Sequence, residues 1–194
     1  MIRLLDGVHL WSRFDPEKRF NFNGHVLKTA AGVVMVDPVP LSDDDLAYLE
    51  TAGLTPDLLV ITNRNHLRAR EQVLARWKVP VVLHEAEVAQ AGVPADRTVK
   101  DGDDLLGLRV VHLPGKSPGE IALLWPARRA LLVGDALLAP YGGLKTVPDE
   151  KMDDPALLRL SLARLKTLDF DVLLVGDGDP LVADAKAAVA AFLR

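Results

Sequence analysis

Two strand-rich stretches, each followed by helical sequence, constrain the fold of this 194-residue chain more than any other feature. The first contains Gly32–Asp37, a nearly continuous apolar run that is typical of a buried strand. Strands expected at Asp57–Thr62 and Val79–His84 then alternate with helices, which indicates parallel pairing. The second stretch contains three short strands between residues 108 and 133, which predicts an antiparallel meander. The sequence therefore predicts an α/β fold, a four-layer α/β/β/α sandwich of two packed sheets with helices outside.

Helix starts are marked by residues that can cap or initiate the first turn. Ser42 precedes three aspartates, and Asp154 and Asp179 each precede a proline, so helices are expected to begin at these three places. The helix that starts at Asp179 is expected to run to the end of the chain. A further helix is expected from about Leu67 to Trp77, and a short one over residues 85–90.

Composition and charge exclude several classes of protein. The chain has 23 Lys and Arg against 27 Asp and Glu, whereas a dedicated nucleic-acid binder usually carries a basic stripe. It has no cysteine, which rules out disulfide frameworks, thiolate zinc sites and cysteine nucleophiles. No apolar run approaches the ~18 residues that a membrane span needs, and no signal peptide is evident. We therefore expect one cytoplasmic domain over residues 1–194 that acts without nucleic acid or membrane. Homodimers are the commonest oligomers, so a homodimer is the default expectation.

Five short motifs occur at predicted strands or at their ends, where a site would lie in such a sandwich: Gly32–Asp37, Leu59–Arg68, His112–Gly119, Leu131–Asp135 and Gly176–Gly178. Their order and spacing resemble those of the metallo-β-lactamase superfamily over nearly the whole chain. The resemblance implies the α/β/β/α fold. It also implies a site formed by the loops that follow the strands.

In active members of that superfamily, an H-x-H-x-D-H loop, two later histidines and an aspartate hold two metal ions, usually zinc. Most of the matching positions in this chain carry other residues: Asn63, Asn65, Leu67, Arg68, Lys116 and Asp177. Only Asp135 keeps the ligand that the resemblance implies. Leucine cannot coordinate a metal, neutral amides are poor zinc ligands, and two of the substitutes are cations. We therefore expect no two-zinc centre and no cofactor.

The substitutions also suggest what replaces the metal ions. Asp135 and Asp177 follow predicted buried strands, and an unpaired buried carboxylate is costly. Our hypothesis is that Lys116, with Arg68, neutralises the two carboxylates in a hydrogen-bonded cluster. The alternative is that Lys116 points into solvent from its turn.

Cationic residues also surround the expected helix start after Thr62. Arg64, Arg68 and Lys116 could together bind an anionic small molecule, because arginine and a helix start both favour anions. The alternative is an ordinary solvated helix face. His66 falls on a variable position of the motif between ligand positions, so we expect it to be exposed and not to be a ligand.

Three functions remain open on this sequence. The first is a non-catalytic binding or regulatory module, working on a small molecule or beside another protein. The second is a hydrolase with an atypical mononuclear site, in which Asp135 and Asp177 with the Asn63 and Asn65 amides hold one divalent metal such as manganese or magnesium. The third is a binder of an anionic small molecule in the former active-site cleft.

Overall fold

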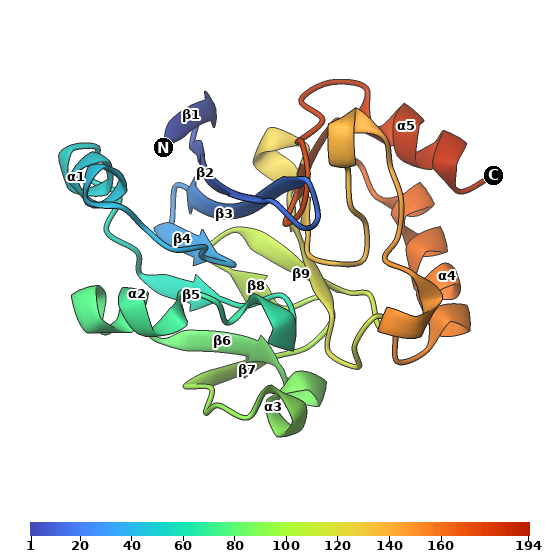
Figure 1. Cartoon of the computed structure of the whole chain (residues 1–194), viewed down its shortest axis with the longest axis horizontal. Helices are drawn as coiled ribbons and strands as arrows, with labels where there is room; N and C mark the ends of the chain where they lie inside the picture. The colour runs from blue at the N-terminus through green and yellow to red at the C-terminus, as the bar shows by residue number, and fades with distance from the viewer.

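The computed structural model describes residues 1–194 and contains two β-sheets that pack face to face with helices on their outer sides (Figure 1). Helices α1, α2 and α3 cover one side, and α4 and α5 cover the other. This arrangement is the predicted four-layer α/β/β/α sandwich, so the predicted fold class is confirmed. None of the helices has the length and apolar character that a membrane crossing requires.

The first sheet has seven strands that follow one another in sequence order: β1 (Ile2–Leu5), β2 (Val8–Asp15), β3 (Phe20–Lys28), β4 (Val33–Val36), β5 (Leu58–Val60), β6 (Val81–His84) and β7 (Arg97–Val99). Strands β1 to β4 pair antiparallel, and β4 to β7 pair parallel. The parallel part is the region where strands alternate with helices in the sequence, as predicted.

The second sheet has five strands in the order β12-β11-β10-β9-β8: β8 (Asp104–Leu105), β9 (Leu108–His112), β10 (Ile121–Trp125), β11 (Ala130–Val133) and β12 (Val172–Val175). Strands β9 to β11 form the predicted antiparallel meander, and the short strand β8, which was not predicted, extends it by antiparallel pairing with β9. Strand β12 pairs parallel with β11, because the chain returns to it through helix α4.

The helices are α1 (Asp43–Thr51), α2 (Arg70–Trp77), α3 (Glu85–Ala91), α4 (Pro155–Ala163) and α5 (Ala185–Phe192). Helix α1 begins as predicted, since the Ser42 and Asp45 side chains cap each other's backbone N–H groups. Helix α2 begins later than the predicted Leu67, because residues 64–66 form a separate 3₁₀ turn, η1. The predicted helix start at Asp179 is wrong. Leu181 pairs with Leu173 of β12 instead, and the helix begins only at Ala185.

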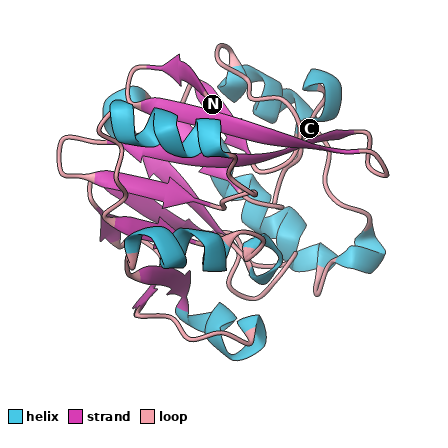
Figure 2. Ribbon diagram, turned by 60° about the vertical axis from the view of Figure 1, so that its left-hand side comes forward, coloured by secondary structure: helices cyan, strands magenta, loops and turns pink.

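Figure 2 shows helices lying against the strands. Three apolar interfaces hold the four layers together, and strand β4 illustrates two of them. Its residues alternate between two cores. Val34 and Val36 lie in the core between the sheets, and Val33 and Met35 lie in the core beneath α1 and α2. A third apolar core lies between the second sheet and helices α4 and α5. Burial on both faces explains why the sequence of this strand is continuously apolar.

Candidate functional site

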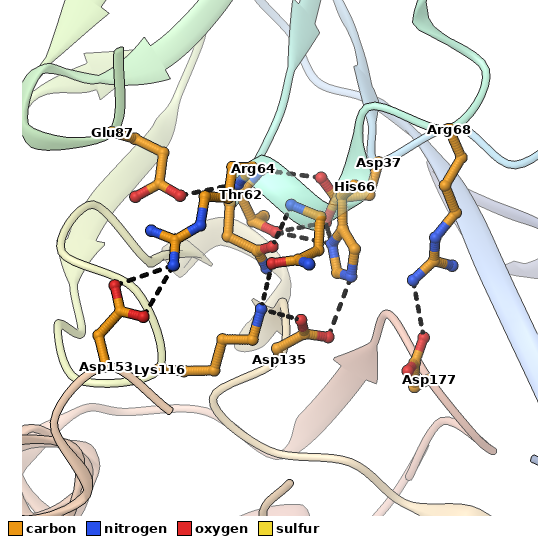
Figure 3. A network of polar contacts seen from close by, with 12 residues as sticks. Asp37, Thr62, Arg64, His66, Arg68, Glu87, Lys116, Asp135, Asp153 and Asp177 are labelled. Carbon is orange, nitrogen blue, oxygen red and sulfur yellow. Dashed lines mark hydrogen bonds and ion pairs between the residues drawn. The ribbon is translucent and has the colours of Figure 1, made fainter. Parts of the chain in front are cut away.

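The candidate site lies where strands of both sheets end (Figure 3). Four polar residues come directly or almost directly after strand ends: Asp37 after β4, Thr62 after β5, Asp135 after β11 and Asp177 after β12. Parallel neighbours end at the same edge of a sheet, which brings each pair together. The sheets are tied together beside the site, because the Asn23 N–H donates to the Gly176 carbonyl at 2.8 Å.

His66 lies at the centre of the site and is 1% exposed. Its Nδ1 is 2.8 Å from an Asp37 oxygen, and its Nε2 is 3.0 Å from an Asp135 oxygen. Burial lowers the pKa of this imidazole, but the charges of Asp37 and Asp135 outweigh burial and raise the pKa well above its ordinary value. The side chain is therefore an imidazolium held between two carboxylates.

The expectation that His66 is exposed is wrong, and two features of the folded chain explain why. The Asn63 side chain accepts a hydrogen bond from the Asn65 N–H at 2.9 Å, which winds residues 64–66 into the η1 turn and points His66 inward. Gly176 leaves room for the ring, since a Cβ there would lie 2.9 Å from the His66 Cε1 atom. The sequence gives no local sign of this burial. Thr62 Oγ1, four residues away, lies 3.0 Å from Nδ1, but the two carboxylate partners of His66 are 29 and 69 residues away.

Lys116 lies in the turn between β9 and β10 and is buried. Its Nζ is 2.7 Å from an Asp135 oxygen and donates to the Asn65 side-chain oxygen at 2.5 Å. The alternative in which Lys116 points into solvent is therefore wrong. Burial raises the pKa of Asp135, but the positive charges of His66 and Lys116 and their hydrogen bonds lower it overall, so this carboxylate stays ionised.

Arg68 approaches Asp177 from the rim of the site. Its guanidinium lies 3.4 Å from an Asp177 oxygen and stacks over the Phe22 ring at 4.0 Å from the centroid. Burial and the charge of Asp135 raise the pKa of Asp177 by more than His66 and Arg68 lower it. Arg68 therefore compensates the Asp177 charge only in part, as its longer contact distance suggests.

The charges of these residues balance. We call six of them the floor cluster: Asp37, His66, Arg68, Lys116, Asp135 and Asp177. The cluster contains three carboxylates and three cations. Glu120 lies buried next to it without a hydrogen-bond partner, and burial together with the Asp135 charge raises its pKa well above the usual range. This shift favours the neutral form of Glu120. The three carboxylates and three cations of the floor cluster give it a formal charge of zero.

The residues present do not fit the two-metal centre of the family. The Asn63 oxygen binds the Asn65 backbone, and the Asn65 oxygen binds Lys116. Leu67 packs against the apolar core beneath the helices. Lys116 places its ammonium group 2.7 Å from Asp135, where a metal ion would otherwise balance the carboxylate.

One smaller group could still hold a single metal ion. His66, Asp135 and Asp177 each offer a ligand atom, and these three atoms lie within 4.8 Å of one another. An imidazole and two carboxylates suit several divalent ions. To bind one, however, His66 must give up its proton, and Asp135 must give up at least one of its two cationic partners.

A buried carboxylate fixes the two loops that form the site. Glu87 of α3 is fully buried, and its two oxygens accept hydrogen bonds from the Arg64 N–H at 2.8 Å and the Gly119 N–H at 2.7 Å. The Arg64 side chain turns outward and pairs with Asp153 at 2.8 Å. The predicted anion-binding residues Arg64, Arg68 and Lys116 thus come together in space, but each already has a carboxylate partner.

A cleft of about 700 Å³ opens above the floor cluster. Three carboxylates line it: Glu17, Asp135 and Asp177. Six cationic side chains line it as well: Lys18, Arg64, Arg68, Lys116, Lys145 and Lys151. Lys18, Lys145 and Lys151 could not be predicted from the sequence because they lie outside every motif. Only the folded chain brings residues 18, 145 and 151 to one opening.

The family model of the metallo-beta-lactamase superfamily matches residues 5–192. The chain belongs to this superfamily. Among curated relatives, a hydroxyacylglutathione hydrolase of Brucella anthropi is 32% identical over 124 residues, which are 56% of this chain and 47% of that protein. The corresponding enzyme of Brucella ovis is 33% identical over 100 residues, 48% of this chain and 38% of that protein. The chain thus aligns with less than half of the length of these relatives.

Solved structures of the superfamily share the fold along nearly the whole chain. A protein crystallised in a di-iron-bound form superposes with a TM-score of 0.72 at 26% identity, covering 93% of this chain and 96% of that one. A beta-lactamase domain protein from Burkholderia ambifaria superposes with a TM-score of 0.76 at 22% identity, covering 100% of this chain and 74% of that one. The second likeness concerns the fold alone, because the sequence identity is low.

Proposed function

We propose that this chain binds an organic anion in the cleft above the floor cluster and acts as a non-catalytic binding module. The observation that carries the proposal is the charge of the cleft wall, where six cationic side chains face three carboxylates. An excess of positive charge in a concave site attracts and retains anions. The floor cluster adds a second argument, because its carboxylates are already balanced by the chain's own cations.

The proposal can be tested by measuring metal content and ligand binding on the same purified protein. We expect sub-stoichiometric metal and an unfolding temperature that a chelator leaves unchanged. A thermal-shift series with phosphates, nucleotides and carboxylic acids should identify anions that stabilise the chain. A ligand at 100 times its dissociation constant adds about 2.7 kcal/mol to the free energy of unfolding. A series in which no anion raises the unfolding temperature would contradict the proposal.

A second candidate function rests on the spacing of His66, Asp135 and Asp177. Their ligand atoms lie within 4.8 Å of one another. A mononuclear metal hydrolase needs ligand atoms that are close enough to bind one ion in this way. Relatives that carry the name hydroxyacylglutathione hydrolase suggest a thioester as the substrate to try first. For this function, incubation with zinc, iron or manganese should give one bound ion per chain and metal-dependent thioester hydrolysis. Asp177→Asn should then remove both.

A further inference from the structure

The six cations of the cleft divide into two groups by their partners. Arg64, Arg68 and Lys116 each form an ion pair with a carboxylate of the chain. The other three, which we call the rim lysines, are Lys18, Lys145 and Lys151, and none of them has an ion-pair partner within the chain. The unbalanced positive charge of the cleft therefore lies at the rim.

The backbone holds each rim lysine in place. The N–H of Lys18 donates to the Asp15 side chain at 2.8 Å in the turn between β2 and β3. Lys145 pairs with Leu138 through two backbone hydrogen bonds of 2.8 and 2.9 Å. The N–H of Lys151 donates to the Pro148 carbonyl at 2.9 Å. The three side chains thus extend from backbone positions that hydrogen bonds define.

The three rim lysines line one and the same opening. A side-chain contact with Lys18 and the Lys18 charge lower the pKa of Lys151, although the neighbouring Glu150 raises it. Lys145 lies beside them at the same opening, with its ammonium 5.4 Å from the centroid of the Phe20 ring. Three ammonium groups and only one carboxylate, Glu17, line this part of the cleft, so positive charge is in excess there and would attract an anion.

The floor is a poor place for the anionic group of a ligand. Lys116 already donates to Asn65 and Asp135, and Arg68 is taken up by Asp177 and the Phe22 ring. The carboxylates of Asp135 and Asp177 would also repel a second anion. The carboxylate oxygens of Asp135 and Asp177 line the cleft, and they can accept hydrogen bonds from neutral hydroxyl or amide groups of a ligand.

We propose that the cleft binds a small phosphomonoester, whose phosphate is bound at the rim by Lys18, Lys145 and Lys151 while its neutral polar part reaches the floor. A phosphate has three terminal oxygens and nearly two negative charges at neutral pH, which matches three ammonium groups at one opening. This inference rests on the proposed function, because it specifies the anion and its position in the same cleft.

The test is isothermal titration of the full chain at low ionic strength with four probes. Adenosine monophosphate and inorganic phosphate carry the phosphate, adenosine lacks it, and citrate is a carboxylate anion. The rim variant is the double substitution Lys18→Gln with Lys151→Gln. The control variant, Lys100→Gln with Lys166→Gln, removes the same charge from exposed positions elsewhere on the surface.

We expect adenosine monophosphate to bind the wild type more tightly than adenosine does. The rim variant should bind adenosine monophosphate about tenfold more weakly, as the loss of two charge-assisted contacts implies, whereas the control variant should bind like the wild type. Unchanged affinity in the rim variant would overturn the inference, and so would an equal loss in both variants.

Two outcomes separate this inference from the proposed function. If citrate binds and neither phosphate probe does, the phosphate assignment is wrong and the anion-binding function stands. If a phosphate probe binds with equal affinity to the wild type and the rim variant, the rim assignment is wrong and the function again stands. If none of the anions binds the wild type, both the phosphate inference and the proposed anion-binding function are wrong.

Discussion

The floor cluster and the rim lysines both contain three cations, yet they have opposite character. On the floor, every cation lies against a carboxylate, and His66 and Lys116 are almost entirely buried. At the rim, all three lysines are exposed and have no carboxylate partner. A count of positive residues would treat the two regions alike. This difference in pairing is the basis for the proposal that the rim, and not the floor, holds the anionic group of a ligand.

The substitution Lys116→Met should give the largest effect. It leaves an Asp135 oxygen buried without its ammonium partner, and breaking a buried ion pair in this way costs about 3 kcal/mol of unfolding free energy. Urea denaturation measures this loss. The matched rim substitution Lys151→Met should change the free energy of unfolding by less than about 0.5 kcal/mol. Equal effects at the two positions would remove the distinction between floor and rim.

The next largest effect is expected for Glu87→Gln, which tests how the loops above the floor are held. The glutamine amide can accept only one of the two backbone N–H bonds and directs its own N–H₂ at the other donor. We expect a loss of about 1–3 kcal/mol in urea denaturation. The control Glu85→Gln, on the same helix but more exposed, should have little effect. A Glu87→Gln protein as stable as the wild type would show that these two bonds do not hold the loops.

Stability should also depend on pH through the floor cluster. The folded pKa of His66 is raised, so its contribution is fully present below the unfolded value of 6.5 and is lost as pH rises through the folded pKa. The pKa of Glu120 is also raised in the folded chain, so its contribution to the unfolding free energy falls as pH rises above 4.5, the ordinary pKa of glutamate. Unfolding free energy should therefore fall as pH rises above 6.5, by at most about 1.4 kcal/mol per pH unit for each group.

The variant His66→Gln isolates one part of this pH dependence. Chemical denaturation over a series of pH values should give a flatter curve above pH 6.5 than for the wild type. The remaining slope would belong to Glu120. Identical slopes for variant and wild type would mean that His66 keeps an ordinary pKa.

The smallest effect is expected for Arg68→Lys. Lysine keeps the charge near Asp177 but loses the planar stack on Phe22, so thermal unfolding should show a loss of less than about 1 kcal/mol. Arg76→Lys on the exposed face of α2 is the control. A loss as large as that of Lys116→Met would place Arg68 among the groups on which the floor depends.

The sequence alone predicted most of the strands and the regions of parallel and antiparallel pairing, because apolar runs and turns are local patterns, but it did not predict the short strands β7 and β8. The apolar run at Gly32–Asp37 became β4, and the alternation after it became the parallel part of the first sheet. The helix start at Ser42 was also right, since capping is a contact between near neighbours. The start at Asp179 was wrong, because a pairing of Leu181 with β12 outweighed the local preference.

For the candidate site too, some features could be predicted from the sequence and others required the folded chain. The sequence by itself determined which residues occupy the family's ligand positions and that cations and carboxylates would be present together. Only the tertiary structure decided that His66 lies between Asp37 and Asp135, and that Lys18, Lys145 and Lys151 share one opening. The physical reason is distance along the chain. Burial, ion pairing and pKa depend on residues that are far apart in sequence and become neighbours only when the two sheets pack.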